Sequence, residues 1–168
     1  IDTVITVSNT AGGVFIDIIE SLASDPITKI NFVMPGFHTT YETEPFHPKF
    51  LGFLQDFQVI RFMDWMATNN SNNSDWSDRN SPTYYSQTGE NGIAPEILID
   101  LCNREMKDPW ICIPHAATDD FIIQMANLLH TTLDPSLTIH IEYSNEVWNS
   151  VFSQNQFSIV MGTALGYS

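Results

Sequence analysis

Apolar runs bounded by turn-forming or polar residues recur four times between residue 30 and residue 143. They predict β-strands at residues 30–34, 57–63, 110–113 and 137–143, because short runs rich in β-branched and aromatic residues are typical of buried strands. Helical segments separate these strands. Strands joined through helices pair in parallel by right-handed crossovers, so the pattern predicts an α/β fold.

Two apolar stripes predict the helices between the last three strands. They repeat every three to four residues and consist of Ile97, Leu98, Leu101 and Cys102, and of Phe121, Ile122, Met125, Leu128 and Leu129. Pro95 suits a first helical turn, and Thr118 before two aspartates suits an N-cap. We interpret both stripes as core packing and not as cofactor-binding surfaces.

The first 24 residues follow a different pattern. Two β-rich runs flank Gly12-Gly13, whose freedom to adopt positive φ predicts a β-hairpin over residues 3–20. An isolated hairpin is only marginally stable. We therefore expect residues 1–24 to be the end of a preceding β-rich domain, and residues 25–168 to form a second domain whose sheet is separate from the hairpin.

The sequence is strongly acidic. Its 20 acidic and 6 basic residues give a formal charge of -14, which repels nucleic-acid phosphates and anionic membrane surfaces. No apolar run approaches the roughly 20 residues of a membrane span. These features argue against a nucleic-acid partner and a membrane-spanning segment, and a well-solvated surface is the simplest interpretation of the acidity.

A polar loop rich in Asn and Ser, residues 67–91, follows the second predicted strand. Long loops in this position are commonly functional. The loop contains two acceptor patterns for N-glycosylation, at Asn69 and Asn72, which matter only in a secretory eukaryotic host. The alternative is that Asn and Ser side chains structure the loop through local backbone hydrogen bonds. Its Trp76 is the aromatic residue that we most readily assign to a ligand.

The segment 139–149, around the end of the fourth predicted strand, carries the most suggestive chemistry. Strand alternation places its polar side chains on one face, namely those of His140, Glu142, Ser144 and Glu146. Glu146 would then lie at the carboxyl end of the strand. Burial beside Trp148 would raise its pKa and suit it to protonating a glycosidic oxygen. The alternative is that Asn145-Glu146 merely begins the next helix.

Three motifs in order carry a family resemblance. They are Arg61-Phe62-Met63-Asp64-Trp65-Met66, Trp110-Ile111-Cys112-Ile113-Pro114-His115 and Glu142-Tyr143-Ser144-Asn145-Glu146-Val147-Trp148-Asn149. Together they make residues 25–168 resemble clan A glycoside hydrolases, which are TIM-type (β/α)8 barrels, and more closely a group of large secreted proteins labelled cellulose-binding or glycosidase-like. The resemblance implies that the chain carries the first four β/α units of such a barrel.

The resemblance also implies roles for individual residues. Glu146 would be the acid/base residue, Asn145 would hydrogen-bond a sugar hydroxyl, and Arg61 would steady the nucleophile. His115 would line the same mouth, so that Arg61, His115 and Glu146 converge at the carboxyl ends of parallel strands. The family's nucleophile is a Glu on the seventh strand, and only four strands are predicted here. The starting residue Ile1 suggests a processed or excised piece of a longer protein.

Local carboxylates are poor substitutes for that nucleophile. Glu142 lies four residues from Glu146 on one strand, roughly 13 Å away, so we expect a buried acid paired with Arg61 or His115. Asp64 stays a candidate second acid or substrate contact. Trp148 and Trp76 offer flat faces for sugar rings, although core packing explains such aromatic residues equally well.

The leading hypothesis is an extracellular or cell-surface glycoside-hydrolase-like module that acts on a polysaccharide without cofactor or metal. The alternative is a non-catalytic carbohydrate-binding or structural component of an extracellular assembly. The expected partners are a glycan and, for a complete barrel, its remaining half in the same or another chain. Cys102 and Cys112 are expected as two buried thiols, with a single bridge as the alternative.

Overall fold

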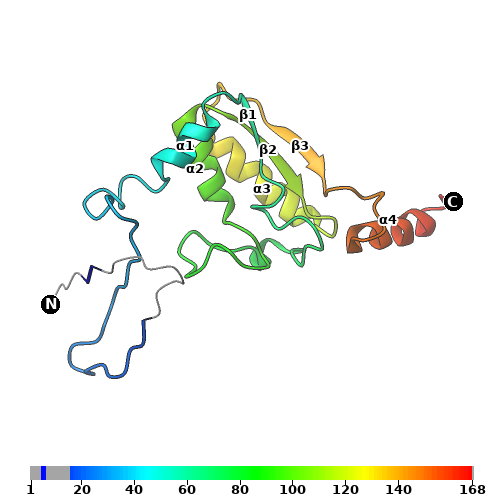
Figure 1. Cartoon of the computed structure of the whole chain (residues 1–168). Helices are drawn as coiled ribbons and strands as arrows, with labels where there is room; N and C mark the ends of the chain where they lie inside the picture. Colours follow the sequence, from blue (N-terminus) through cyan, green and yellow to red (C-terminus); the bar gives the residue numbers. More distant parts are fainter. Residues whose placement is uncertain (1–4, 7–15, 168) are drawn as a thin grey trace. The chain divides into compact units, whose positions relative to one another are not determined.

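The structure is a computed structural model that describes residues 5–6 and 16–167 (Figure 1). The chain divides into two compact units, Ile1–Pro45 and Phe46–Ser168. Among the described residues, every named helix and strand belongs to the second unit. The candidate chemistry therefore lies in the second unit.

A sheet of three parallel strands forms the centre of this unit. The strands β1 (Val59–Arg61), β2 (Asp108–Ile113) and β3 (His140–Tyr143) are ordered β1-β2-β3, so β2 pairs with both neighbours. Arg61 lies opposite Trp110, and Trp110 lies opposite His140. The parallel α/β pairing predicted for the last three strands is confirmed, and all three carboxyl ends meet at one edge of the sheet.

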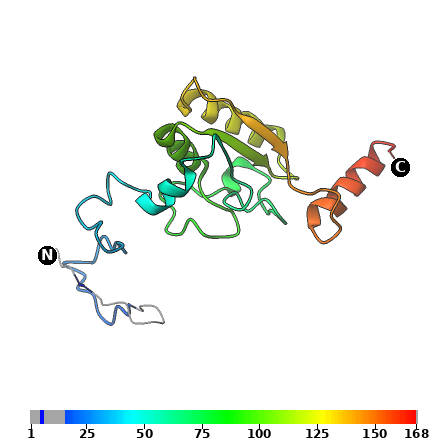
Figure 2. The same ribbon diagram turned by 45° about the horizontal axis from the view of Figure 1, so that its top comes forward.

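Two amphipathic helices cover one face of the sheet (Figures 1 and 2). They are α2 (Pro95–Glu105) and α3 (Asp119–Thr132), and each begins as the sequence predicted. Pro95 occupies the first turn of α2, and Thr118 caps α3 by accepting a hydrogen bond from the backbone N–H of Phe121. The helices and the sheet enclose a core that includes Phe62, Leu98, Leu101, Ile111, Phe121, Met125 and Leu129.

Two of the remaining helices contribute side chains that pack against this core, whereas the last helix of the chain does not. Helix α1 (Pro48–Leu54) stacks Phe50 on Trp65, with ring centroids 5.5 Å apart, and the short 3-10 helix η1 (Trp76–Asp78) lies in the long polar loop. Helix α4 (Ser153–Ala164) follows β3 and has Gln154 as its buried residue. Most of the apolar side chains of α4 are thus exposed.

The predicted half barrel is wrong. The sheet has three strands and is open, and residues 30–34 form no strand: Phe32 is 72% exposed and Ile30 is 52% exposed. These residues lie in the first unit, where the β-pairing among described residues is an isolated bridge between Leu22 and Asp25. An apolar run becomes a strand only where a partner strand satisfies its backbone groups.

The predicted N-terminal hairpin is also wrong in the part that the structure describes. Residues 16–19, the end of its second run, form no strand, and Ile19 is 96% exposed. The rest of the hairpin, except residues 5 and 6, lies outside the described residues.

Two strands of the sheet differ in length from the prediction. Strand β1 is shorter than the predicted strand 57–63, whereas β2 begins at Asp108, before the predicted strand 110–113.

Replacement of Phe121 should test the core. Phe121 is 1% exposed and meets Trp76 edge-on with ring centroids 5.4 Å apart. Phe121→Ala should lower the free energy of unfolding by about 3–5 kcal/mol, because it leaves a cavity between α3 and the loop. Ile123→Ala on the same helix, where Ile123 is 57% exposed, should cost no more than about 0.5 kcal/mol. Urea titration of both variants measures the difference, and equal losses would contradict this description of the core.

Candidate functional site at the carboxyl edge of the sheet

Polar and aromatic side chains occupy the sheet face opposite α2 and α3. Arg61, Trp110 and His140 form one row across the three strands. The Arg61 guanidinium carbon lies 5.3 Å from the centroid of the Trp110 ring, and the Trp110 and His140 ring centroids are 6.3 Å apart. Cation–π attraction therefore orients Arg61 along the sheet.

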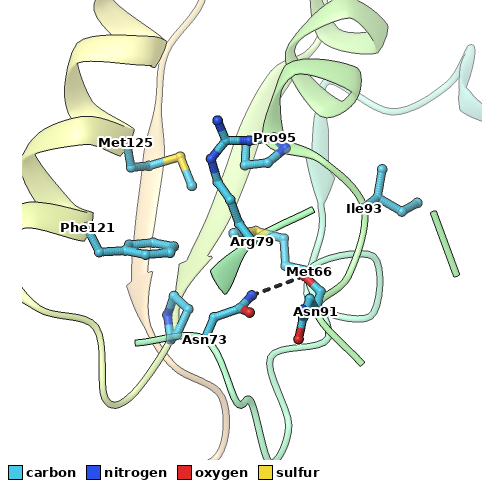
Figure 3. A pocket seen from close by; sticks show the side chains of 9 residues that line it. Met66, Asn73, Arg79, Asn91, Ile93, Pro95, Phe121 and Met125 are labelled. Atoms are coloured by element: carbon cyan, nitrogen blue, oxygen red, sulfur yellow. Dashed lines mark hydrogen bonds between the residues drawn. The ribbon is translucent and has the colours of Figure 1, made fainter. Parts of the chain in front are cut away.

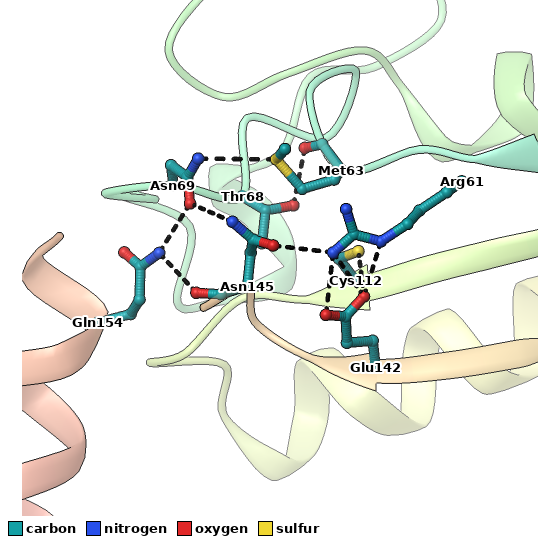
Figure 4. Close-up of polar contacts among 8 residues, drawn as sticks. All are labelled: Arg61, Met63, Thr68, Asn69, Cys112, Glu142, Asn145 and Gln154. Atoms are coloured by element: carbon teal, nitrogen blue, oxygen red, sulfur yellow. Dashed lines mark hydrogen bonds and ion pairs between the residues drawn. The ribbon is translucent and has the colours of Figure 1, made fainter. Parts of the chain in front are cut away.

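Arg61 is held by the carboxylate of Glu142 on β3. Its Nε donates to Oε2 at 2.9 Å, and its Nη2 donates to Oε1 at 2.9 Å and to Oε2 at 2.8 Å (Figure 4). The two side chains are 34% and 27% exposed. Arg61 is thus one of the two partners expected for Glu142, and the pair is half-buried.

The pair changes the acidity of its neighbours. Partial burial lowers the pKa of Arg61, but hydrogen bonds from the guanidinium to Glu142 and nearby negative charge outweigh burial and raise it overall. Beneath the pair, the thiol of Cys112 donates to Glu142 Oε2 at 3.4 Å. Burial, reinforced by the Glu142 charge, raises the pKa of Cys112 to about 12. Cys112 and Cys102 are both buried and free, so neither forms a bridge.

Asn145, in the loop after β3, connects that loop to the Arg61–Glu142 pair and to Asn69. Its Oδ1 accepts from Arg61 Nη2 at 2.8 Å, and its Nδ2 donates to Asn69 Oδ1 at 2.9 Å (Figure 4). Its side chain is buried, with the residue 5% exposed. The resemblance implied a contact between Asn145 and a sugar hydroxyl, but the amide is engaged within the protein. Asn145 is placed to position the loop.

Gln154 of α4 completes the network and gave no signal in the sequence. Its Nε2 donates to Asn69 Oδ1 at 2.8 Å and to the Asn145 carbonyl at 2.9 Å, and its Oε1 accepts from the Asn70 N–H at 3.0 Å. It is completely buried. In the sequence it stands among similar residues in Ser153-Gln154-Asn155-Gln156, so nothing distinguishes it before the fold is known.

The loops joined by this network hold an unusual backbone. Four non-glycine residues adopt left-handed conformations there, with φ of 47° at Ala67, 55° at Asn70, 54° at Ser144 and 41° at Glu146. Such conformations cost roughly 1–2 kcal/mol for residues with a side chain. They persist only where surrounding contacts fix them, and residues of this kind cluster at functional sites.

Glu146 and Trp148 project from the fixed loop. Glu146 is exposed, and its Oε2 accepts from Asn149 Nδ2 at 2.9 Å. Trp148 is 74% exposed. The sequence suggested a carboxylate desolvated beside Trp148. In the structure, the Glu146 carboxylate lies on the surface instead. Asn145-Glu146 does not begin a helix, because α4 starts at Ser153.

The other expected site residues lie in different surroundings. His115 follows β2 and is 9% exposed, with its ring 5.1 Å from Phe157 of α4, and burial lowers its pKa. Among the described residues, its Nδ1 has no hydrogen-bond partner. Asp64 is exposed beyond β1, and its charge contributes to the raised pKa of Arg61. His115 thus packs against α4, whereas Arg61 binds Asn145 next to Glu146.

The long loop is structured by its own side chains. Trp76 contacts Phe121, and the Arg79 guanidinium carbon lies 4.0 Å from the centroid of the Trp76 ring. These contacts occupy the ring that the sequence suggested for a ligand. Of the two possible glycosylation sites, Asn72 is exposed, whereas the Asn69 amide belongs to the network around Asn145.

Within residues 5–6 and 16–167, no group of three His, Cys, Asp or Glu side chains is arranged to hold a metal ion. No helix in this part of the chain combines the length and apolar character that crossing a bilayer requires. Comparison with protein-family models, with curated proteins and with solved structures finds no match to this chain.

Neutralising Glu142 should weaken the sheet. Glu142→Gln leaves the half-buried Arg61 without its counter-charge. We expect the free energy of unfolding to fall by about 1–2 kcal/mol. This loss is smaller than the loss for a fully buried pair, because solvent screens the two charges. Asp100→Asn is the matched control, because it removes the more exposed Arg104–Asp100 pair and should cost about 0.5 kcal/mol or less. Urea titration measures the free energy of unfolding of both variants. An equal loss in the two would contradict a special contribution of the Arg61–Glu142 pair to stability.

Replacement of Gln154 should release α4 and the Asn145 loop. Gln154→Leu removes three hydrogen bonds, and it leaves the buried Asn145 carbonyl and the part-buried Asn70 N–H without their partner, at a cost of about 2–3 kcal/mol. Amide hydrogen exchange in α4 should accelerate beyond the change elsewhere. Gln156→Leu, an exposed position on the same helix, should leave exchange unchanged. Equal protection of α4 in both variants would contradict the anchoring role.

Proposed function

We propose that the chain is a glycoside-hydrolase-like module that acts on an extracellular polysaccharide, with Glu146 as the general acid/base. Glu146 lies just beyond β3, at the carboxyl edge of a parallel sheet. Ligand sites of α/β folds are built at that edge from the loops after the strands. Of the three motifs that resemble clan A glycoside hydrolases, the first contributes Arg61 to this region and the third contributes Asn145 and Glu146.

The anchored Asn145 is the observation that carries the proposal. Side-chain hydrogen bonds connect it directly to Arg61 and Asn69, and Gln154 binds its carbonyl. The adjacent Glu146 therefore projects from a backbone that is already fixed. A carboxyl group held in place needs little reorganisation when it transfers a proton to or from a bound substrate.

Trp148 supplies a surface for a sugar ring beside this acid. Its indole is amphipathic and rigid, and 74% of the residue is exposed two positions from Glu146. A sugar offers both an apolar ring face and hydroxyl groups, and this pair of side chains matches both. Carboxylate-based glycoside cleavage requires no cofactor.

A second candidate function is carbohydrate binding without catalysis. Glycoside hydrolysis usually uses two carboxyl groups, and Glu142, the other carboxylate of the same segment, is engaged by Arg61 and Cys112. Glu146 is then the exposed acid of the segment 142–149. This arrangement suits sugar recognition even where a second acid is lacking.

The two functions separate in one set of measurements on the full chain. Glu146→Gln should lower hydrolysis of natural polysaccharide by about 10²- to 10⁴-fold and leave glycan binding nearly unchanged, because glutamine keeps the shape but cannot deliver a proton. Trp148→Ala should weaken binding. Asp56→Asn, which alters an exposed acid before β1, is the control and should change neither.

The outcomes distinguish the candidates. Hydrolysis that depends on Glu146 supports the enzyme. Binding that depends on Trp148, without hydrolysis of any glycan in a broad panel, supports the binding module. A full chain that neither binds nor cleaves any glycan in the panel contradicts both proposals.

A further inference from the structure

Strand β3 is an open edge of the sheet. It pairs with β2 on one side, and no described segment pairs with it on the other (Figures 1 and 2). On the face that α2 and α3 cover, Ile111 of β2 is 1% exposed, whereas its register partner Ile141 of β3 is 59% exposed. Near the end of β2 the packing is close, since the cavity lined by Phe121 and Met125 has a volume of about 10 Å³ (Figure 3). The covering layer therefore ends before β3.

The backbone of β3 presents a row of hydrogen-bonding groups at this edge. Ser144, just after β3, donates its N–H to the Ile113 carbonyl of β2 at 2.8 Å. Alternate residues of a parallel strand direct their N–H and C=O groups to the same side, so Ile139, Ile141 and Tyr143 direct theirs away from β2. Among the described residues, these groups form no hydrogen bond. Such an edge is a template for another strand, and β3 contains neither the lysine nor the proline that commonly blocks this pairing.

The side chains of β3 complement those of a second β3 that runs in the opposite direction. Antiparallel pairing centred on Ile141 places this residue opposite its own copy, and it places His140 opposite Glu142 and Ile139 opposite Tyr143 of the second chain. The three outward-directed residues then all fall in hydrogen-bonded pairs. His140 and Glu142 fall in non-hydrogen-bonded pairs, where side chains approach more closely. A histidine ring donates a hydrogen bond to a carboxylate in either of its charge states.

The carboxylate of Glu142 is already positioned for this contact. Its Oε2 accepts from Arg61 and from the Cys112 thiol, whereas its Oε1 accepts one hydrogen bond from Arg61 among the described residues. A carboxylate oxygen has two lone pairs, so Oε1 can accept another hydrogen bond. His140 is exposed on the same face of the sheet, next to Trp110. Both groups are therefore in place before two chains meet.

We propose that two copies of the chain associate through β3, in an antiparallel pair centred on Ile141 in which His140 of each chain hydrogen-bonds Glu142 of the other. The pairing is two-fold symmetric and closes on itself, as in most homodimers. It joins the three strands of each chain into one continuous sheet. It also gives the exposed Ile141 and Tyr143 apolar neighbours on the face that the helices leave open. The dimer goes beyond the proposed function, which uses the loops after the strands.

Sedimentation of the full chain over a wide range of protein concentrations tests the dimer. Each chain carries a formal charge of -14, so the measurement is made at about 0.15 M salt or above, where exposed charges more than about 8 Å apart are largely screened. We expect a reversible equilibrium between monomer and dimer. A chain that stays monomeric at every concentration, whether or not another segment covers β3, would overturn the proposal. Open-ended oligomers would overturn it as well.

Substitutions in β3 test which side chains meet. Ile141→Lys places two like charges directly opposite each other and should raise the Kd of the dimer by about tenfold or more. Phe53→Lys in α1, where Phe53 is 77% exposed, is the matched control and should leave the Kd unchanged. At the exposed position 140, His140→Glu should weaken the dimer and His140→Lys should not, because each new side chain faces Glu142. Equal Kd values for these two variants would overturn the proposal, even if Ile141→Lys did not fold.

Cysteine cross-linking tests the register. In the proposed pairing the two copies of residue 141 have Cα atoms about 5.5 Å apart, which a disulfide can span. The two copies of residue 139 lie four residues out of register, roughly 13 Å apart, which a disulfide cannot span. Cys102 and Cys112 are both buried and do not compete. Mild oxidation should therefore link Ile141→Cys into a covalent dimer and leave Ile139→Cys unlinked, and the opposite result would overturn the proposed register.

Discussion

The ion pair between Arg61 and Glu142 joins the two outer strands of the sheet across the middle one. Strands β1 and β3 share no backbone hydrogen bonds, because each pairs with β2. Both are also short, with three and four residues. The side-chain pair therefore supplies the connection that the backbone cannot make, on the face of the sheet that α2 and α3 leave uncovered. The loops beyond the strands depend on it because Arg61 also holds Asn145.

The hydrogen bonds beyond Asn145 stabilise a backbone that would be unfavourable alone. Left-handed residues occur in both loops that Gln154 connects, at Ala67 and Asn70 on one side and at Ser144 and Glu146 on the other. Their cost is offset by amide groups that are satisfied inside the protein. A loop of this kind has one preferred conformation, which is the property required of a segment that presents Glu146 and Trp148.

The sequence predicted the local structure better than the contacts between distant segments. Periodicity located α2 and α3, and strand alternation placed Glu142 on the polar face where Arg61 could reach it. Periodicity could not show that residues 30–34 lack a partner strand. An apolar run indicates a preference for β-structure but does not identify the strand with which it would pair. Gln154 and the contacts of Trp76 were unpredictable for the same reason: each depends on how a loop meets a helix far along the chain.

The burial of both thiols bears on their reactivity in the folded protein. Thiol–disulfide exchange proceeds through the thiolate, and a pKa of about 12 for Cys112 leaves roughly one thiol in 10⁵ ionised at neutral pH. Burial raises the pKa of Cys102 to about 12 as well. In the folded protein both thiols are therefore poor nucleophiles, and thiol–disulfide exchange at either one requires the surrounding core to open first.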